Sequence, residues 1–227
     1  MNISGKSDSL NSLSVTKRAL KPEKRIIGRE IMYKDYLVEF MTAERDAVTK
    51  LIEETGEQYD EVIDALLACQ GKVVFFGIGK SGHIGAKLAA TFASTGTPSM
   101  FVHAAEARHG DFGMIESRDV VILLSHSGTT SETTSAVAAL KNIGCKTIAF
   151  CKSADSTLAK KCDLAVTYPF DKESDRLGVA PSSSTTLQLV LGDAIGLTLS
   201  ALKGFTREDF HKFHPGGALG KMLEEHK

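Results

Sequence analysis

The chain has 227 residues, of which 42% are hydrophobic and 24% charged, and its formal net charge at pH 7 is −1. This composition is typical of a soluble globular protein with one sizeable core, and the small net charge excludes a general attraction to nucleic acid or membrane surfaces. The longest uninterrupted apolar runs are too short to span a bilayer, and the N-terminus lacks the apolar core of a secretory signal. Because the four cysteines include no C-x-x-C pair, we expect no disulfide or zinc framework and a cytoplasmic location.

The N-terminal segment, residues 1–27, is predicted to be a flexible basic leader. Residues 1–25 contain six Lys or Arg and two Asp or Glu, a net charge of +4. No aromatic residues are interleaved with these charges, so a solvated leader is preferred to a nucleic-acid-binding arm. The remainder, residues 28–227, is predicted to form one domain, with no room for another after its last motif.

Two helices are predicted before the first strand. The second has an apolar stripe at helical spacing: Tyr59, Val62, Ile63, Leu66 and Leu67. A similar apolar face covers residues 37–52, and Gly56 is expected to separate the two helices.

After residue 70 the pattern changes to short apolar runs that alternate with helices. Five strands are predicted, at residues 72–76, 99–102, 119–124, 146–150 and 164–168. Helices are predicted at residues 81–94, 130–142, 156–161 and 183–202. The last of these is densely apolar and is expected to end at Gly204. Strands without internal alternation, separated by helices, indicate a three-layer α/β fold with a parallel sheet covered on both faces.

The first strand-to-helix turn reads GIGKSG, residues 77–82. A P-loop would need glycine at position 74, where this chain has Val74. A dinucleotide-binding turn would need an acidic residue at the end of the next strand, where this chain has His103. Two interpretations remain: a phosphate site formed by backbone N–H groups with Lys80 and Ser81, or a plain turn whose glycines permit close packing.

The loop after the third strand reads SHSGTTSE, residues 125–132, and also opens a helix. Five hydroxyl side chains surround Gly128 there: Ser125, Ser127, Thr129, Thr130 and Ser131. A helix N-cap needs only one of them, whereas a phosphomonoester accepts many hydrogen bonds. Ligands of open parallel sheets bind beyond the carboxyl ends of the strands, where both loops lie. The second loop therefore favours a sugar-phosphate site.

Four blocks in this order resemble the SIS (sugar isomerase) domain family, and within it the arabinose 5-phosphate isomerases of the Kdo pathway. They are residues 71–115, 125–132, 176–194 and 204–223, and the resemblance covers about residues 35–223. It implies a flavodoxin-like fold with a five-stranded sheet, and N-terminal helices that form an oligomer, expected to be a homotetramer. The chain departs from the family by ending before the paired CBS domains of many members, and by having Thr129 where close relatives often have Glu.

The resemblance implies conversion of D-ribulose 5-phosphate to D-arabinose 5-phosphate, without a metal or cofactor, for Kdo and lipopolysaccharide synthesis. An aldose–ketose conversion through an enediol needs a general base, a proton relay and stabilisation of the enediolate charge. The implied catalytic residues are Lys80, Glu132, Glu173 and His214. Lys80 would neutralise the enediolate, and the base is left open among the other three. Each also has an interpretation without a catalytic role. Lys80 and Glu132 would be ordinary charged residues in the first turn of a helix, Glu173 a solvated surface carboxylate, and His214 a histidine packed at a turn.

The residues expected to bind the substrate come from the two loops and the segment after the second strand: Gly79, Ser81, His109, Ser125, His126, Ser127 and Thr130. A metal held by His103, His109 and Asp111 is the disfavoured alternative, because their spacing matches no strong ligand pattern.

Three further hypotheses concern partners. In related domains the segment around His214 reaches a neighbouring subunit, which implies active sites shared between subunits. Kdo or its nucleotide-activated form is a candidate feedback inhibitor that binds the catalytic cleft. The rival functions are another phosphosugar isomerase, such as one for heptose phosphates, and a non-catalytic phosphosugar sensor.

Overall fold

The computed structural model describes residues 32–216, and the chain divides into two compact units between Val38 and Glu39. The fold set out below is that of the second unit. The predicted leader lies outside the described residues, so it stays a prediction. Helix α1 (Tyr33–Glu53) is followed by the short helix η1 (Glu57–Tyr59) and by α2 (Asp60–Leu67). Gly56 lies between α1 and η1, as expected from the sequence.

One parallel sheet of five strands forms the centre of the domain, in the order β2-β1-β3-β4-β5. The strands are β1 (Val73–Gly77), β2 (Ser99–His103), β3 (Val120–Leu124), β4 (Lys146–Cys151) and β5 (Leu164–Thr167). After β1 the chain places β2 on one side and β3 on the other, so the strand order reverses at β1. This is the flavodoxin-like order, and the fold prediction is confirmed.

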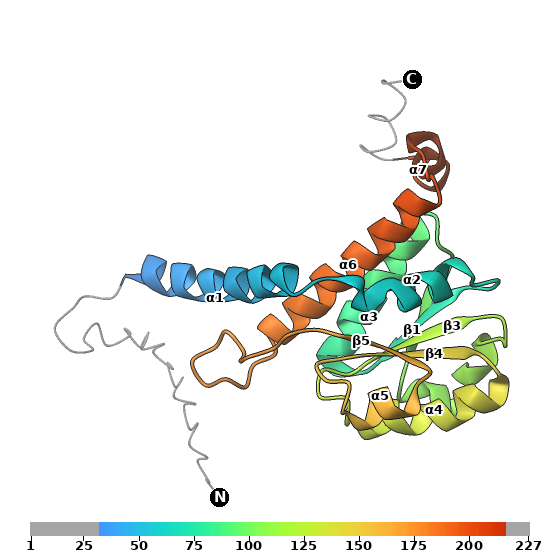
Figure 1. The fold of residues 1–227 in the computed structure, drawn as a ribbon, viewed down its shortest axis with the longest axis horizontal. Helices are drawn as coiled ribbons and strands as arrows, with labels where there is room; N and C mark the ends of the chain where they lie inside the picture. The colour runs from blue at the N-terminus through green and yellow to red at the C-terminus, as the bar shows by residue number, and fades with distance from the viewer. Residues whose placement is uncertain (1–31, 217–227) are drawn as a thin grey trace, which may run out of the picture. The chain divides into compact units, whose positions relative to one another are not determined.

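Helices cover both faces of the sheet, which gives three layers (Figure 1). Helices α2, α3 (Gly79–Ser94) and α6 (Ser183–Leu202) pack on one face, and α4 (Ser131–Ile143) and α5 (Thr157–Lys161) on the other. Successive strand residues point to opposite faces. Phe75 packs with Leu88 of α3, whereas Phe76 packs on the side of Leu140 of α4. Because both faces of the sheet are covered by helices, every residue of the central strands β1 and β3 is buried, and each of these strands has an uninterrupted apolar sequence.

Three short helices were not predicted from the sequence: η2 (Glu106–His109), η3 (Asp111–Met114) and α7 (Arg207–Phe213). Helix α7 begins with a capping box, because the Thr206 hydroxyl accepts from the backbone N–H of Asp209 and the Asp209 carboxylate accepts from that of Thr206.

By length and composition alone, helix α6 could cross a membrane. Its apolar residues have another explanation in this fold. Leu187, Leu191, Ile195 and Leu199 follow one another at helical spacing and are buried in the core cluster with the sheet. Core packing therefore accounts for the composition of α6.

Gly196 allows α6 to approach α3 closely. A methyl group at Gly196 would lie 2.6 Å from Cε2 of Phe92. The Phe92 ring is buried and packs edge-on against Phe75, with ring centroids 4.9 Å apart, so it has little room to move. We expect Gly196→Ala to lower the free energy of unfolding by about 1–2 kcal/mol, because overpacking outweighs the better helix propensity of alanine.

Chemical denaturation measures this effect. Gly113→Ala is the matched control, because no atom lies within 4 Å of a Cβ built at Gly113. Equal stabilities of the Gly196→Ala and wild-type proteins would show that the contact between α3 and α6 is not tight.

Candidate active site

The candidate site lies at the carboxyl ends of β1 and β3, which are neighbours in the sheet. Each strand leads directly into a loop and a helix: β1 ends at Gly77 and α3 begins at Gly79, while β3 ends at Leu124 and α4 begins at Ser131. Two helix N-termini, each with unpaired backbone N–H groups and a partial positive charge, thus lie at the point where the strand order reverses. An anionic ligand is favoured at such a point.

The glycines of the first turn have two different roles. A Cβ on Gly82 would lie 3.3 Å from the carbonyl carbon of Gly77, and a Cβ on Gly77 would lie 3.4 Å from the Cα of Gly82. These two glycines therefore allow α3 to pack closely against β1. For Gly77 and Gly82 the structure agrees with the interpretation that the glycines permit close packing. Gly79 differs, because its φ is +62° and no atom lies within 4 Å of a Cβ built there. Only Gly79 has open space for a ligand next to its backbone.

The two polar side chains of the first turn have free hydrogen-bonding capacity. Lys80 is exposed and Ser81 is partly buried, both in the first turn of α3. Neither side chain makes a hydrogen bond or ion pair with another residue between positions 32 and 216. A cation at a helix N-terminus opposes the helix dipole, so Lys80 is unfavourable there unless it meets an anion.

Hydroxyl groups hold the second loop in one conformation. Ser125 is buried, with its Oγ 2.8 Å from Thr130 Oγ1, and it accepts a hydrogen bond from the backbone N–H of Gly128. Ser127 Oγ lies 2.9 Å from Thr129 Oγ1 and accepts a hydrogen bond from the backbone N–H of Thr129. The conformation of the loop is therefore stabilised by hydrogen bonds among its own residues.

Gly128 is the one position of this loop where the structure requires a glycine. Its φ is +67°, and a Cβ there would lie 2.3 Å from Ser156 Oγ. The N-cap residue of α4, Thr130, makes no side-chain capping bond. The hydroxyls of this loop thus serve its own conformation rather than helix capping.

Glu132 is exposed in the first turn of α4. Its carboxylate accepts a hydrogen bond from the Ser131 hydroxyl at 2.7 Å. This bond, with the nearby charge of Arg108, lowers the pKa of Glu132. His109, from the same short helix as Arg108, is exposed as well.

Glu173 lies in the segment between β5 and α6 and is buried, with 8% of its surface exposed. Its Oε2 accepts hydrogen bonds from the backbone N–H groups of Ser182, at 2.9 Å, and Ser184, at 3.0 Å. Burial raises the pKa of Glu173, but hydrogen bonds from Ser184 and Ser182 outweigh it and hold the pKa below 4.5. The interpretation of Glu173 as a solvated surface carboxylate is therefore wrong.

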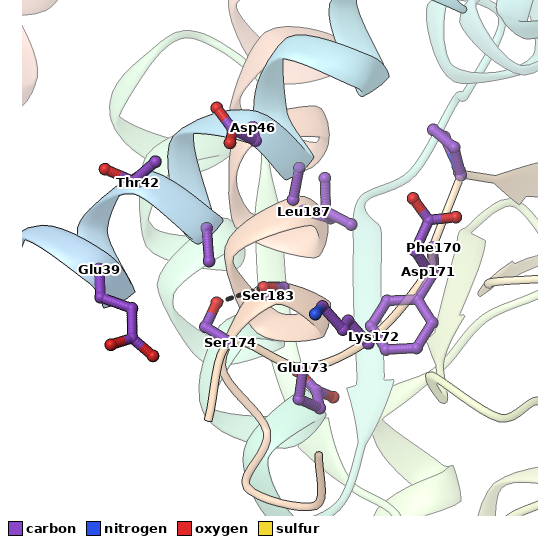
Figure 2. Close-up of a pocket in the computed structure, with 13 residues that line it drawn as sticks. Glu39, Thr42, Asp46, Phe170, Asp171, Lys172, Glu173, Ser174, Ser183 and Leu187 are labelled. Carbon is purple, nitrogen blue, oxygen red and sulfur yellow. Dashed lines mark hydrogen bonds between the residues drawn. The ribbon is translucent and has the colours of Figure 1, made fainter. Parts of the chain in front are cut away.

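A cavity of about 330 Å³ lies beside Glu173, between α1, the segment after β5 and the start of α6 (Figure 2). Lys172 and Ser174 line it from the same segment as Glu173. Ser174 hydrogen-bonds to Ser183 of α6 and to Glu44 of α1. The segment that carries Glu173 is thus held by α1 on one side and by α6 on the other.

Two ion pairs add to this anchoring of the Glu173 segment. Arg176 pairs with Glu39 at 2.6 Å, and Asp171 pairs with Lys50 at 2.7 Å. Both pairs are largely exposed to solvent, which screens them, so we expect each to contribute little to stability.

His214 lies apart from Glu173 within one chain. It follows α7, its Nδ1 is 2.9 Å from the carbonyl oxygen of Phe210, and its ring stacks on the Phe210 ring. Glu173 binds the first residues of α6, whereas α7 follows the last, and the 20 residues of α6 span about 30 Å (Figure 1). His214 could therefore join the other site residues only in a second copy of the chain.

Metal ligands are not assembled in the described part of the chain. Residues 32–216 contain no group of three or more His, Cys, Asp or Glu side chains placed to hold a metal ion. The alternative based on His103, His109 and Asp111 thus has no support from geometry. His103 ends β2 beside Gly77, and its buried Nδ1 has no hydrogen-bond partner in the described residues.

The residues around the His126 ring were not predicted from the sequence as part of the site: Tyr168 and Phe170 contact the ring, and Gln188 lies close to the Tyr168 hydroxyl. Its Nδ1 lies 3.0 Å from Tyr168 Oη, and its ring packs edge-on against Phe170 at a centroid distance of 4.3 Å. Gln188 is fully buried in α6. Gln188 could have been noticed in the sequence, because a glutamine stands out within an apolar helix. Tyr168 could not, because it only continues the apolar run of β5.

Comparisons with known proteins agree with this fold. Residues 66–197 match the family described as SIS domain. The curated arabinose 5-phosphate isomerase KdsD of Pseudomonas aeruginosa is 49% identical over 180 residues, which cover 79% of this chain and 55% of that protein. KdsD of Escherichia coli K12 is 46% identical over 185 residues, covering 82% and 56% respectively. The chain thus spans little more than half the length of these relatives.

Two solved structures are informative. The E. coli CFT073 protein c3406, solved in complex with arabinose 5-phosphate, is 50% identical, with a TM-score of 0.79 over 82% of this chain and 100% of that one. The Vibrio vulnificus NanR protein complexed with ManNAc-6P has a TM-score of 0.64 at 13% identity, over 82% and 66%, a likeness of fold alone. Since the matching SIS segment covers more than half of its residues, this chain belongs to the SIS domain family.

Proposed function

We propose that this chain is an aldose–ketose isomerase that interconverts D-ribulose 5-phosphate and D-arabinose 5-phosphate. One observation carries the proposal: a loop of hydroxyl side chains held by its own hydrogen bonds, Ser125 to Thr130, lies where the strand order reverses and beside the turn that carries Lys80. The identity to relatives named arabinose 5-phosphate isomerase, and to a protein solved with arabinose 5-phosphate, supports the choice of sugar.

The reaction divides among the residues as follows. The phosphate would bind at the two helix N-termini through Ser81, Ser125, Ser127 and Thr130. A base removes a proton from C1 of the ketose, the enediol forms, and a proton returns to C2 as the C1 oxygen becomes the aldehyde. We assign the base to Glu173, whose pKa is held low enough for it to stay ionised at neutral pH.

The other predicted residues have supporting roles. Lys80 would neutralise the charge that develops on the enediolate oxygen. Gly79, His109, His126 and Glu132 would contact the sugar. His214, supplied by a second copy of the chain, would relay a proton between the two oxygens, because an imidazole both accepts and donates a proton through its ring nitrogens.

The wider setting is also part of the proposal. The enzyme would act in the cytoplasm as a homotetramer and supply Kdo and lipopolysaccharide synthesis. All four cysteines are free thiols, which supports a reducing compartment. Kdo or its nucleotide-activated form would inhibit by binding the catalytic cleft, and steady-state inhibition kinetics with each compound would test this.

Proton exchange with solvent tests the function. The purified protein should exchange a C1 proton of D-ribulose 5-phosphate with deuterium oxide and convert D-arabinose 5-phosphate, followed by proton NMR. Conversion of heptose phosphates instead would identify the rival isomerase. Binding of D-arabinose 5-phosphate without any exchange would identify a sensor.

Replacement of Lys80 should lower turnover without harming the fold. We expect Lys80→Met to reduce kcat/KM by about 10- to 100-fold, since a hydrogen bond to a charged group is worth about 1.5–3 kcal/mol. Lys87→Met is the matched control, because Lys87 lies on the same helix and pairs with Asp193 instead. If the two variants lose activity equally, Lys80 has no specific role in the reaction.

A further inference from the structure

A chain of buried polar groups lies behind His126. The Tyr168 hydroxyl, 3.0 Å from His126 Nδ1, belongs to a buried residue that is only 3% exposed. Gln188 is fully buried and lies close to the same hydroxyl. Its amide makes no hydrogen bond of normal geometry with any residue between positions 32 and 216. Burial of an unpaired amide is costly. The nearby Tyr168 hydroxyl, which is also polar and buried, best explains why a glutamine stands at position 188.

The His126 ring is held from several sides. Phe170 packs edge-on against it, and Lys152 Nζ lies 5.5 Å from the centroid of the Phe170 ring. The backbone carbonyl of His126 accepts a hydrogen bond from the backbone N–H of Lys152. In the described part of the chain, no protein group bonds to Nε2 of His126. The ring is therefore fixed in orientation with one nitrogen left for a ligand.

The surrounding charges keep this histidine neutral. Burial lowers the pKa of His126, the positive charge of Lys152 lowers it further, and Glu173 opposes them by raising it. Burial raises the pKa of Tyr168, so the phenol stays protonated. Neutral imidazole carries one proton, and the partner of Nδ1 decides which nitrogen has it.

The hydrogen-bond chain selects Nε2 for that proton. The phenol O–H is a better donor than an imidazole N–H, and an imidazole nitrogen is a better acceptor than a phenol oxygen. With the Tyr168 O–H directed at Nδ1, the proton of His126 remains on Nε2.

We propose that Tyr168 is a positioning residue that holds His126 as the neutral Nε2–H tautomer, which donates a hydrogen bond to an oxygen of the sugar phosphate. The identity of that ligand rests on the proposed function, whereas the tautomer is a property of the protein alone. The arrangement has a chemical advantage. A charged imidazolium near Glu173 lowers the pKa of Glu173 and weakens it as a base, and a neutral donor avoids this.

Nitrogen-15 NMR of histidine-labelled protein tests the tautomer directly. The ring signals of His126, assigned by their loss in His126→Asn, should show a neutral Nε2–H form at pH 7 and a pKa below about 6.5. In Tyr168→Phe the fixed tautomer should be lost and the pKa of His126 should rise, because the bond that stabilises neutral imidazole is gone.

Tyr59→Phe is the matched control. Tyr59 is also buried, and its hydroxyl donates to the carbonyl oxygen of Thr167, next to Tyr168 in sequence. This variant loses a buried tyrosine hydroxyl without touching His126, so the NMR signals of His126 should not change.

Kinetics give a second measurement. Tyr168→Phe should raise KM for D-arabinose 5-phosphate by about 3- to 10-fold with a smaller change in kcat, and Tyr59→Phe should not. An Nδ1–H tautomer in the wild-type protein, or a Tyr168→Phe variant with unchanged tautomer and pKa of His126, would overturn the inference. A wild-type protein with the expected tautomer but no isomerase activity supports the positioning role and contradicts the proposed function, so the two failures are distinguishable.

Discussion

Replacement of Glu173 by glutamine is expected to slow C1 proton exchange by about 10²- to 10⁴-fold, the usual contribution of a general base. The fold should survive, because the hydrogen bonds from Ser182 and Ser184 all end on one oxygen, Oε2. The amide oxygen of glutamine can take the place of Oε2 and accept the same bonds. The loss would then be chemical rather than structural, and exchange of the C1 proton measured by NMR reports it.

Asp171→Asn is the matched control for Glu173→Gln. Asp171 lies in the same segment, but its side chain is 72% exposed and pairs with Lys50. Its replacement should leave the exchange rate within about twofold of the wild type, because an exposed ion pair contributes little. Full exchange activity in Glu173→Gln would transfer the role of base to Glu132 or to His214.

The pH dependence of kcat/KM distinguishes these candidates, because it reports the ionisation of the free enzyme. The pKa of Glu173 is lowered by its hydrogen bonds, so the contribution of its carboxylate to kcat/KM should stay constant until the pH falls through that lowered value. A histidine base would instead lose activity at higher pH than a carboxylate base, because an imidazole is protonated before a carboxylate as the pH falls. The same bonds stabilise the fold above the ordinary pKa of a glutamate, and this stability is lost as the pH falls through the lowered pKa.

Mixed oligomers of two inactive variants are expected to regain activity. His214→Asn should reduce kcat by about 100-fold or more, if His214 relays a proton. Within one chain His214 and Glu173 belong to opposite ends of α6, so a complete site would take each residue from a different copy. In an oligomer of Glu173→Gln and His214→Asn chains, some sites would therefore receive both native residues.

Random assembly sets the size of this effect. With equal amounts of the two variants, about a quarter to a half of the sites in the purified mixed oligomers should contain both native residues, and activity should recover to that level. Co-expression of the two chains with different affinity tags, followed by sequential purification and the exchange assay, measures it. Each variant alone is the control. If the mixed oligomer remains as inactive as its parents, His214 does not complete the site of another copy.

The secondary structure was largely predictable because its signals are local. The strand predicted at residues 72–76 is found at Val73–Gly77, and the helix predicted at 183–202 has those bounds. Strands buried on both faces need uninterrupted apolar runs, and helices between them need a 3.6-residue period. Helix α7 was missed, although Thr206 and Asp209 carry the spacing of a capping box, because seven residues show too little periodicity.

Part of the site followed from these local signals and part did not. Parallel strands bring their carboxyl ends to one edge of the sheet, so the sequence alone predicts that the loops of Lys80 and Ser125 lie at the same edge. It could not show that Gly77 and Gly82 pack against one another, since a glycine pattern is the same for packing and for ligand approach. Whether such glycines serve packing or ligand approach depends on the distance between the helix and the strand, which only the tertiary structure gives.

The surroundings of Glu173 and His126 were decided by the tertiary structure alone. Glu173 looked like a surface carboxylate because its segment has no periodicity, yet it binds the first residues of α6. His126 and Tyr168 are 42 residues apart in the sequence and meet only because β3 and β5 each lie beside β4. Contacts between distant segments leave no periodic signal in the sequence, whereas they set the burial and the hydrogen bonds that determine protonation.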